Sequence, residues 1–78
     1  DWGLWGAAEG GNRGLIDFFI EKGANAWNLG AYGAAHNGKI EIVEFFIKKG
    51  ADDLKGIIRC GVLSNQTTLV EYFTEKYK

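Results

Sequence analysis

The chain has 78 residues and a formal net charge of −1, which suits one small domain over residues 1–78. This charge argues against non-specific DNA binding, which needs a basic footprint. No stretch is long and uncharged enough to span a membrane. The single cysteine, Cys60, excludes an internal disulfide and favours an intracellular, cytoplasmic location. We therefore expect neither a nucleic-acid partner nor a membrane partner.

The sequence repeats itself at an interval of 27 residues. WGAAEGGNRGLIDFFIEKGAN, which begins at Trp5, returns as YGAAHNGKIEIVEFFIKKGAD, which begins at Tyr32. Residues 1–27 and 28–54 align without a gap and share 11 identical positions, whereas residues 55–78 keep mainly the apolar pattern. Such a period is typical of a solenoid, in which each unit buries its apolar face against its neighbours. We call these three ranges the first, second and third units.

The first unit predicts helices over residues 3–9 and 13–22, joined by a turn at a glycine pair. Helix 3–9 is rich in glycine and alanine. Glycine weakens a helix by roughly 1 kcal/mol relative to alanine, so its recurrence at one register indicates close approach between helix backbones. Lys22 and Gly23 are typical of a helix C-terminus, because a cation complements the helix dipole and glycine adopts the left-handed cap.

The second unit predicts helices over residues 30–36 and 40–49, and the later helix has the clearest pattern in the chain. Val43 and Ile47 share one helical face, which further apolar side chains widen. The breadth of this face implies burial against both neighbouring units. We expect Phe46 to lie buried between units.

The third unit predicts helices over residues 57–63 and 67–76, with Thr67 or Asn65 as the N-cap of the last helix. A terminal unit presents an outer face to water, so its sequence is expected to drift. Cys60 stands where the other units have glycine and is interpreted as a small buried residue. The units carry net charges of −2, −1 and +2, and the basic end is interpreted as a solvated surface.

The first unit carries several aromatic and apolar residues close to the N-terminus. Trp5 recurs as Tyr32, which predicts packing between units, with a partner-facing aromatic strip as the alternative. Trp2, Leu4 and Trp5 lack a polar cap, and exposed apolar patches tend to find partners. We expect self-association through the first unit or a larger parent array that covers it. The alternative is that helix 3–9 tucks both tryptophans under the following helix. The phenylalanines stand at core positions.

No arrangement of residues predicts catalysis, a cofactor or a metal. A metal site needs three or four ligands at suitable spacing. His36 is the only histidine, and the sequence offers no set of Cys or His ligands to accompany it. Glu44 lies one helical turn before Lys48, which is ordinary support for a helix surface. The glycine-rich stretches follow no strand and precede no Gly-Lys-Ser/Thr, so they do not indicate a nucleotide site.

The segment AAHNGKIEIVEFFIKKGAD, from Ala34 to Asp52, resembles the second half of an ankyrin repeat. The match consists of the paired alanines, a variable step of two residues, the turn glycine Gly38, the start IEIV and the closing KGAD. The first unit holds a looser copy, and the third resembles it only in TTLVEYF. Ankyrin repeats have ~33 residues and a T-P-L-H opening that is missing here. The chain is similar to the divergent ankyrin-derived repeats of expanded arrays in large DNA viruses and protists.

This resemblance implies an all-α, ankyrin-like solenoid of three stacked helix-turn-helix repeats, with the β-turn fingers shortened to tight turns. It implies a non-catalytic protein–protein interaction module that binds through the first helix of each unit and the turn after it. The expected partner-binding residues are Glu9, Trp27, Asn28, His36, Asn37, Leu63 and Ser64. The alternative is a structural segment of a longer array with no binding site of its own, which the start of the chain inside a repeat favours.

Overall fold

The computed structural model describes the backbone of residues 2–77 and the side chains of residues 3–77. These residues form six helices and no strand, so the protein is all-α. The helices are α1 (Trp2–Glu9), α2 (Arg13–Glu21), α3 (Trp27–His36), α4 (Ile40–Lys49), α5 (Leu54–Leu63) and α6 (Thr67–Lys76). The bounds of α3 and α5, and those of α4 and α6, differ by 27 residues at both ends. The six predicted helices are confirmed, although α3 and α5 begin earlier than the sequence predicted.

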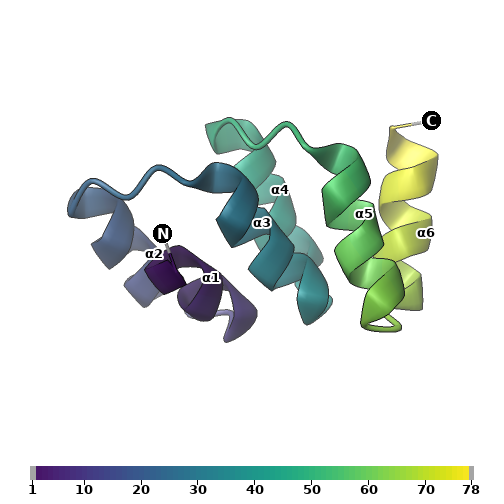
Figure 1. The fold of residues 1–78 in the computed structure, drawn as a ribbon, viewed down its shortest axis with the longest axis horizontal. Helices are drawn as coiled ribbons and strands as arrows, with labels where there is room; N and C mark the ends of the chain where they lie inside the picture. The colour runs from purple at the N-terminus through teal and green to yellow at the C-terminus, as the bar shows by residue number, and fades with distance from the viewer. Residues whose placement is uncertain (1, 78) are drawn as a thin grey trace.

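The helices form three pairs that lie side by side, α1 with α2, α3 with α4 and α5 with α6 (Figure 1). The first helices of the pairs, α1, α3 and α5, form a row in which α3 contacts both of the others. The result is an elongated molecule of 33 × 20 × 16 Å. Its long axis follows the order of the pairs along the chain, from α1 to α6 (Figure 1).

Two helices begin three residues earlier than the sequence predicted. α3 begins at Trp27 and α5 at Leu54, so Trp27, Asn28 and Leu54 lie in first helical turns and not in the connections between units. Asp53 stands just before α5, and its carboxylate accepts a hydrogen bond from the Gly56 backbone amide at 3.1 Å. This N-cap satisfies a donor that the helix itself leaves unpaired, which allows α5 to begin earlier.

The turn inside each unit uses a left-handed residue. Gly11 and Gly38 have φ angles of 70° and 69°, and Asn65 takes the same place in the third unit with a φ of 59°. Asparagine tolerates this conformation better than most residues that have a side chain. Since Asn65 forms the turn, the N-cap of α6 is Gln66, and the prediction of Asn65 or Thr67 was wrong.

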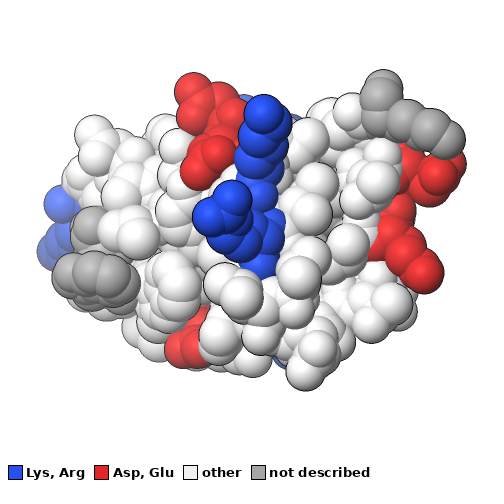
Figure 2. All heavy atoms as spheres, turned by 45° about the vertical axis from the view of Figure 1, so that its right-hand side comes forward, with Lys and Arg blue, Asp and Glu red and all other residues white. Residues whose placement is uncertain are grey.

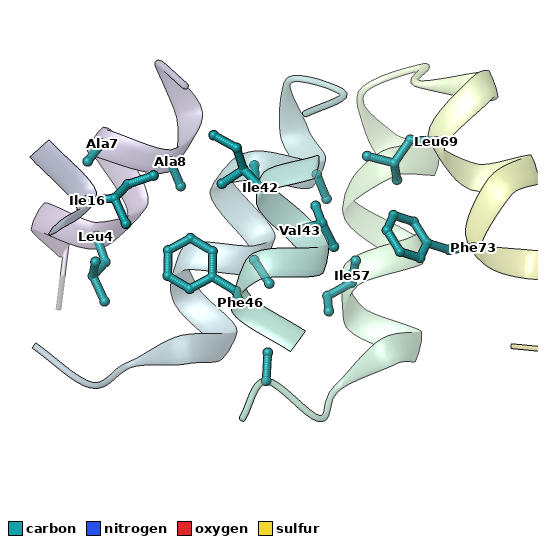
Figure 3. Packing of buried hydrophobic residues seen from close by; sticks show 14 residues of the cluster. Leu4, Ala7, Ala8, Ile16, Ile42, Val43, Phe46, Ile57, Leu69 and Phe73 are labelled. Atoms are coloured by element: carbon teal, nitrogen blue, oxygen red, sulfur yellow. The ribbon is translucent and has the colours of Figure 1, made fainter. Parts of the chain in front are cut away.

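One hydrophobic cluster runs through all three helix pairs (Figure 3). Leu4, Ile16, Val43, Phe46 and Phe73 are among its fully buried members. The ring of Phe46 points from α4 toward the pair α1 and α2 (Figure 3). Its predicted burial is confirmed.

Glycine in the first helices lets other groups come close. A Cβ atom placed on Gly30 would lie 2.5 Å from the ring of Phe46, so this glycine makes room for the main aromatic side chain of the core. A Cβ atom placed on Gly33 would lie 2.5 Å from the backbone carbonyl oxygen of Trp5. The close backbone approach that the sequence indicated therefore occurs between α1 and α3.

At several apolar positions the exposure of the side chain differs from the exposure that the sequence predicted. Leu4 is fully buried, so the predicted exposure of this side chain was wrong, and Trp5 is only half-exposed. The expectation for the side chain of Trp2 lies outside the described residues. Phe18 is 49% exposed on α2 and does not belong to the core. Cys60 is half-buried, and burial raises the pKa of its thiol.

The carboxylate of Glu44 binds groups of the next helix pair. It accepts hydrogen bonds from the hydroxyl of Tyr72, at 2.6 Å, and from the ammonium group of Lys76. The hydrogen bond from Lys76 lowers the pKa of Glu44 most, and the hydrogen bond from Tyr72 lowers it further. The interpretation of Glu44 as support for Lys48 within α4 missed this link from α4 to α6.

Candidate functional site

The C-terminal ends of the three first helices contribute to one edge of the molecule. Glu9, His36 and Leu63 are the last residues of α1, α3 and α5, and Asn37 and Ser64 are the caps that follow α3 and α5. We call these five residues the edge surface. All five were predicted as partner-binding residues, and side-chain contacts connect four of them.

Hydrogen bonds along the edge surface join neighbouring units. The amide of Asn37 donates to the backbone carbonyl of Glu9 at 2.6 Å. Nδ1 of His36 lies 2.5 Å from Oγ of Ser64, and Nε2 lies 3.9 Å from a carboxylate oxygen of Glu9. Gln66 adds a bond to the backbone carbonyl of His36 at 3.2 Å. The sequence did not predict that Gln66 belongs to this network.

The edge surface combines these polar groups with exposed apolar area. Leu63 is 76% exposed, the highest value among the large exposed hydrophobic residues of the described chain. The ring of Trp5 lies 6.2 Å from that of His36, measured between centroids, at a tilt of 42°. Trp5 therefore contacts the neighbouring unit, as one of the two interpretations of the sequence expected. An exposed leucine beside hydrogen-bonding side chains is suited to contact with another protein.

The order Ser64, His36, Glu9 places a hydroxyl, an imidazole and a carboxylate in succession, as in sites of nucleophilic catalysis. Acyl transfer also needs hydrogen-bond donors aimed at the developing oxyanion. The backbone amides of Ser64 and Asn65 already donate to carbonyls of α5, at 3.2 Å each. These neighbouring donors therefore serve the end of the helix.

Trp27 and Asn28 lie at the other end of α3. This helix has 10 residues, so the two ends are about 15 Å apart at the usual rise per residue. The side-chain carbonyl of Asn28 accepts hydrogen bonds from the backbone amides of Asp52 and Asp53, at 3.0 and 3.1 Å. The indole of Trp27 lies 6.4 Å from the ring of Phe46. Both residues lie beside the connection before α5, about a helix length from the edge surface.

A second link at this end joins α3 to the start of α5. The hydroxyl of Tyr32 donates to the carboxylate of Asp53, whose other oxygen caps α5. This hydrogen bond, followed by burial, raises the pKa of Tyr32 from 10.0 to about 12. The same bond and the amide of Gly56 lower the pKa of Asp53. No pattern in the sequence indicated this pair.

The two pKa shifts predict a pH dependence of stability. Tyr32 keeps its proton in the folded protein at a pH where the unfolded chain loses it, so its contribution is complete below pH 10 and is lost as the pH rises toward about 12. Asp53 behaves oppositely, because its pKa is lowered. Its contribution is present above the ordinary value of 3.8 and is lost as the pH falls through the folded value.

We expect Tyr32→Phe to reduce the free energy of unfolding at neutral pH by about 1 kcal/mol, the usual net effect of one hydrogen bond. The difference from the wild type should disappear as the pH approaches 12, as measured by urea denaturation across a pH series. Asp53→Ala should also lower the free energy of unfolding, through loss of the helix cap. In that background Tyr32→Phe should have little further effect. An undiminished effect would show that the hydroxyl of Tyr32 stabilises the fold through another partner.

The site and the fold together define an all-helical protein of three helix pairs with a polar, hydrogen-bonded edge. Among the described residues, no group of three or more His, Cys, Asp or Glu could hold a metal ion. No helix within residues 2–77 has the length and apolar composition needed to cross a membrane. Comparison of the chain with protein-family models, curated proteins and solved structures gives no match.

Proposed function

We propose that the chain is an ankyrin-like solenoid of three stacked helix-turn-helix repeats that serves as a non-catalytic protein–protein interaction module. The 27-residue interval between helix bounds and the row of α1, α3 and α5 support this architecture. The edge surface is the binding site. The observation that carries the proposal is that Leu63, 76% exposed, directly precedes Ser64, whose hydroxyl contacts the exposed side chain of His36.

The chemistry of the edge surface suits an extended protein segment with both apolar and polar side chains. Leu63 offers exposed apolar area, and a partner that covers this area stabilises the complex by removing it from water. The imidazole of His36 and the carboxylate of Glu9 offer polar contacts beside it. Because internal hydrogen bonds already hold His36 and Ser64, binding orders fewer side chains and loses less entropy.

The alternative is a structural segment of a longer array with no binding site of its own. One observation favours it, since polar side chains at both ends of α3 already form hydrogen bonds within the fold. Asn28 binds the connection before α5, and Asn37 binds the end of α1. In this alternative the edge residues serve only to fix one unit against the next.

Selection of peptides from a random display library against the 78-residue chain separates the two proposals. We expect enriched sequences whose affinity, measured by calorimetry, falls at least tenfold in Leu63→Arg, a change of about 1.4 kcal/mol. Phe18→Arg, which introduces the same side chain at a 49% exposed aromatic residue of α2, is the control and should leave the affinity unchanged. Enrichment that survives Leu63→Arg contradicts binding at the edge, and the absence of any enriched sequence supports the structural alternative.

The non-catalytic part of the proposal has its own test. Activated esters offered to the wild type should be hydrolysed no faster than by Ser64→Ala or His36→Ala. A turnover that either substitution abolishes, while circular dichroism shows an intact fold, would make the edge surface an active site.

A further inference from the structure

The α5 end of the molecule leaves open a face that neighbouring units cover elsewhere. Val62 is 56% exposed, whereas Ala35, at the same register of α3, is fully buried. Ile58 is half-buried, whereas its counterpart Ala31 is fully buried. Figure 2 turns this end toward the viewer and shows a largely uncharged surface between a group of cations and the acidic residues on the right. We call Ile58, Val62 and the nearby Glu71 of α6 the tail face.

The opposite end of the molecule, formed by α1 and α2, also exposes positions that are covered in the second unit. Leu15 is 46% exposed, whereas its counterpart Ile42 is 8% exposed. A Cβ atom placed on Gly6 would have no atom of the described residues within 4 Å, although the equivalent atom on Gly33 would meet the carbonyl of Trp5. Gly6 is thus the counterpart in α1 of Gly33, the residue at which α3 contacts α1. No described residue occupies the corresponding space beside Gly6. We call Gly6, Leu15 and Lys22 the head face.

A small residue marks the place where α3 meets α1 inside the molecule. A Cβ atom placed on Gly33 would lie 2.5 Å from the backbone carbonyl oxygen of Trp5, so this glycine allows the close approach of the two helices. Gly6 on the head face is the equivalent residue of the first unit, so it leaves room for the same approach by a helix of a second copy.

We propose that the tail face of one chain binds the head face of a second copy, in the register of the internal boundaries. The charges fit this contact. Glu44 pairs with Lys76 across the boundary between the second and third units. Glu71 of the third unit is equivalent to Glu44 of the second, because it lies 27 residues later. Lys22 of the first unit is equivalent to Lys76 of the third, because it lies 54 residues earlier. Glu71 of one copy therefore lies opposite Lys22 of the next.

The net charges of the end units act in the same direction, since the third unit carries +2 and the first −2. A head-to-tail contact uses different surfaces on its two sides, so it does not close on itself and each dimer can add further copies. This inference concerns the ends of the molecule and is independent of binding at the edge surface. It also replaces the motive for self-association expected from the sequence, because Leu4 is buried.

Analytical ultracentrifugation of the 78-residue chain across micromolar to millimolar concentrations tests the contact. The average mass of the wild type should rise above the 8.6 kDa of the monomer and pass that of a dimer. Gly6→Leu on the head face and Val62→Lys on the tail face should each remain monomeric, with unchanged circular dichroism. Glu41→Leu, which adds the same side chain at an exposed position of α4 in the middle unit, is the control and should associate as the wild type does.

An equal mixture of the two monomeric variants distinguishes head-to-tail from symmetric contacts. The intact tail of Gly6→Leu can bind the intact head of Val62→Lys, and both remaining faces are blocked, so the mass should reach twice that of the monomer and stop. A wild type that stays at 8.6 kDa at every concentration overturns the proposal. So does self-association of either single variant, because it places the contact on another surface.

Discussion

Replacement of Phe46 by alanine is expected to reduce the free energy of unfolding by about 3–5 kcal/mol, the range for a fully buried aromatic side chain. The ring is completely buried, meets Phe45 edge to face at 5.3 Å between centroids and fills the space that Gly30 leaves open. Its removal leaves a cavity that rigid helix backbones surround. Since small domains have total stabilities of only about 5–15 kcal/mol, the variant should unfold at much lower urea concentration.

Phe18→Ala is the matched control for this loss, because Phe18 is the same residue type on the second helix of the first unit but is 49% exposed. Its cost should stay below about 1.5 kcal/mol, since little buried surface is removed. Urea denaturation followed by circular dichroism measures both variants. Equal denaturation midpoints for the two variants would show that Phe46 does not lie in the centre of the core.

Addition of one methyl group at two equivalent glycines is expected to change stability in opposite directions. Gly33→Ala places a Cβ atom 2.5 Å from the carbonyl oxygen of Trp5, so α1 and α3 have to separate. Overpacking of this kind costs about 1–3 kcal/mol. Gly6→Ala meets no described atom within 4 Å. It should stabilise α1 by about 0.5–1 kcal/mol, because alanine has the higher helix propensity.

Thermal unfolding at low micromolar concentration, where association is weakest, measures the two alanine variants. The melting temperature should fall for Gly33→Ala and rise for Gly6→Ala. A fall of equal size in both variants would mean that glycine is needed at this register for a reason within each helix. A stabilised Gly33→Ala would contradict the close approach between α1 and α3.

The sequence predicted the helices well because their signals are local. Apolar residues at helical spacing located α4 and α6 to the residue, and the turn glycines separated the two helices of each unit. The starts of α3 and α5 were misjudged because the resemblance to ankyrin repeats placed a turn at Trp27 and Asn28. That error carried these two residues into the predicted binding surface, although a whole helix separates them from His36.

The sequence by itself determined the repeat, the six helices, the burial of Phe46 and five neighbouring residues of the candidate site. These features follow from short-range spacing, which repeats at every unit. Only the tertiary structure decided which polar groups meet, because the partners are far apart in the chain. Tyr32 and Asp53 are separated by 21 residues, His36 and Ser64 by 28, and Glu44 and Lys76 by 32. Each of these contacts depends on how one helix pair rotates against the next, and the spacing of residues along a single helix carries no information about that rotation.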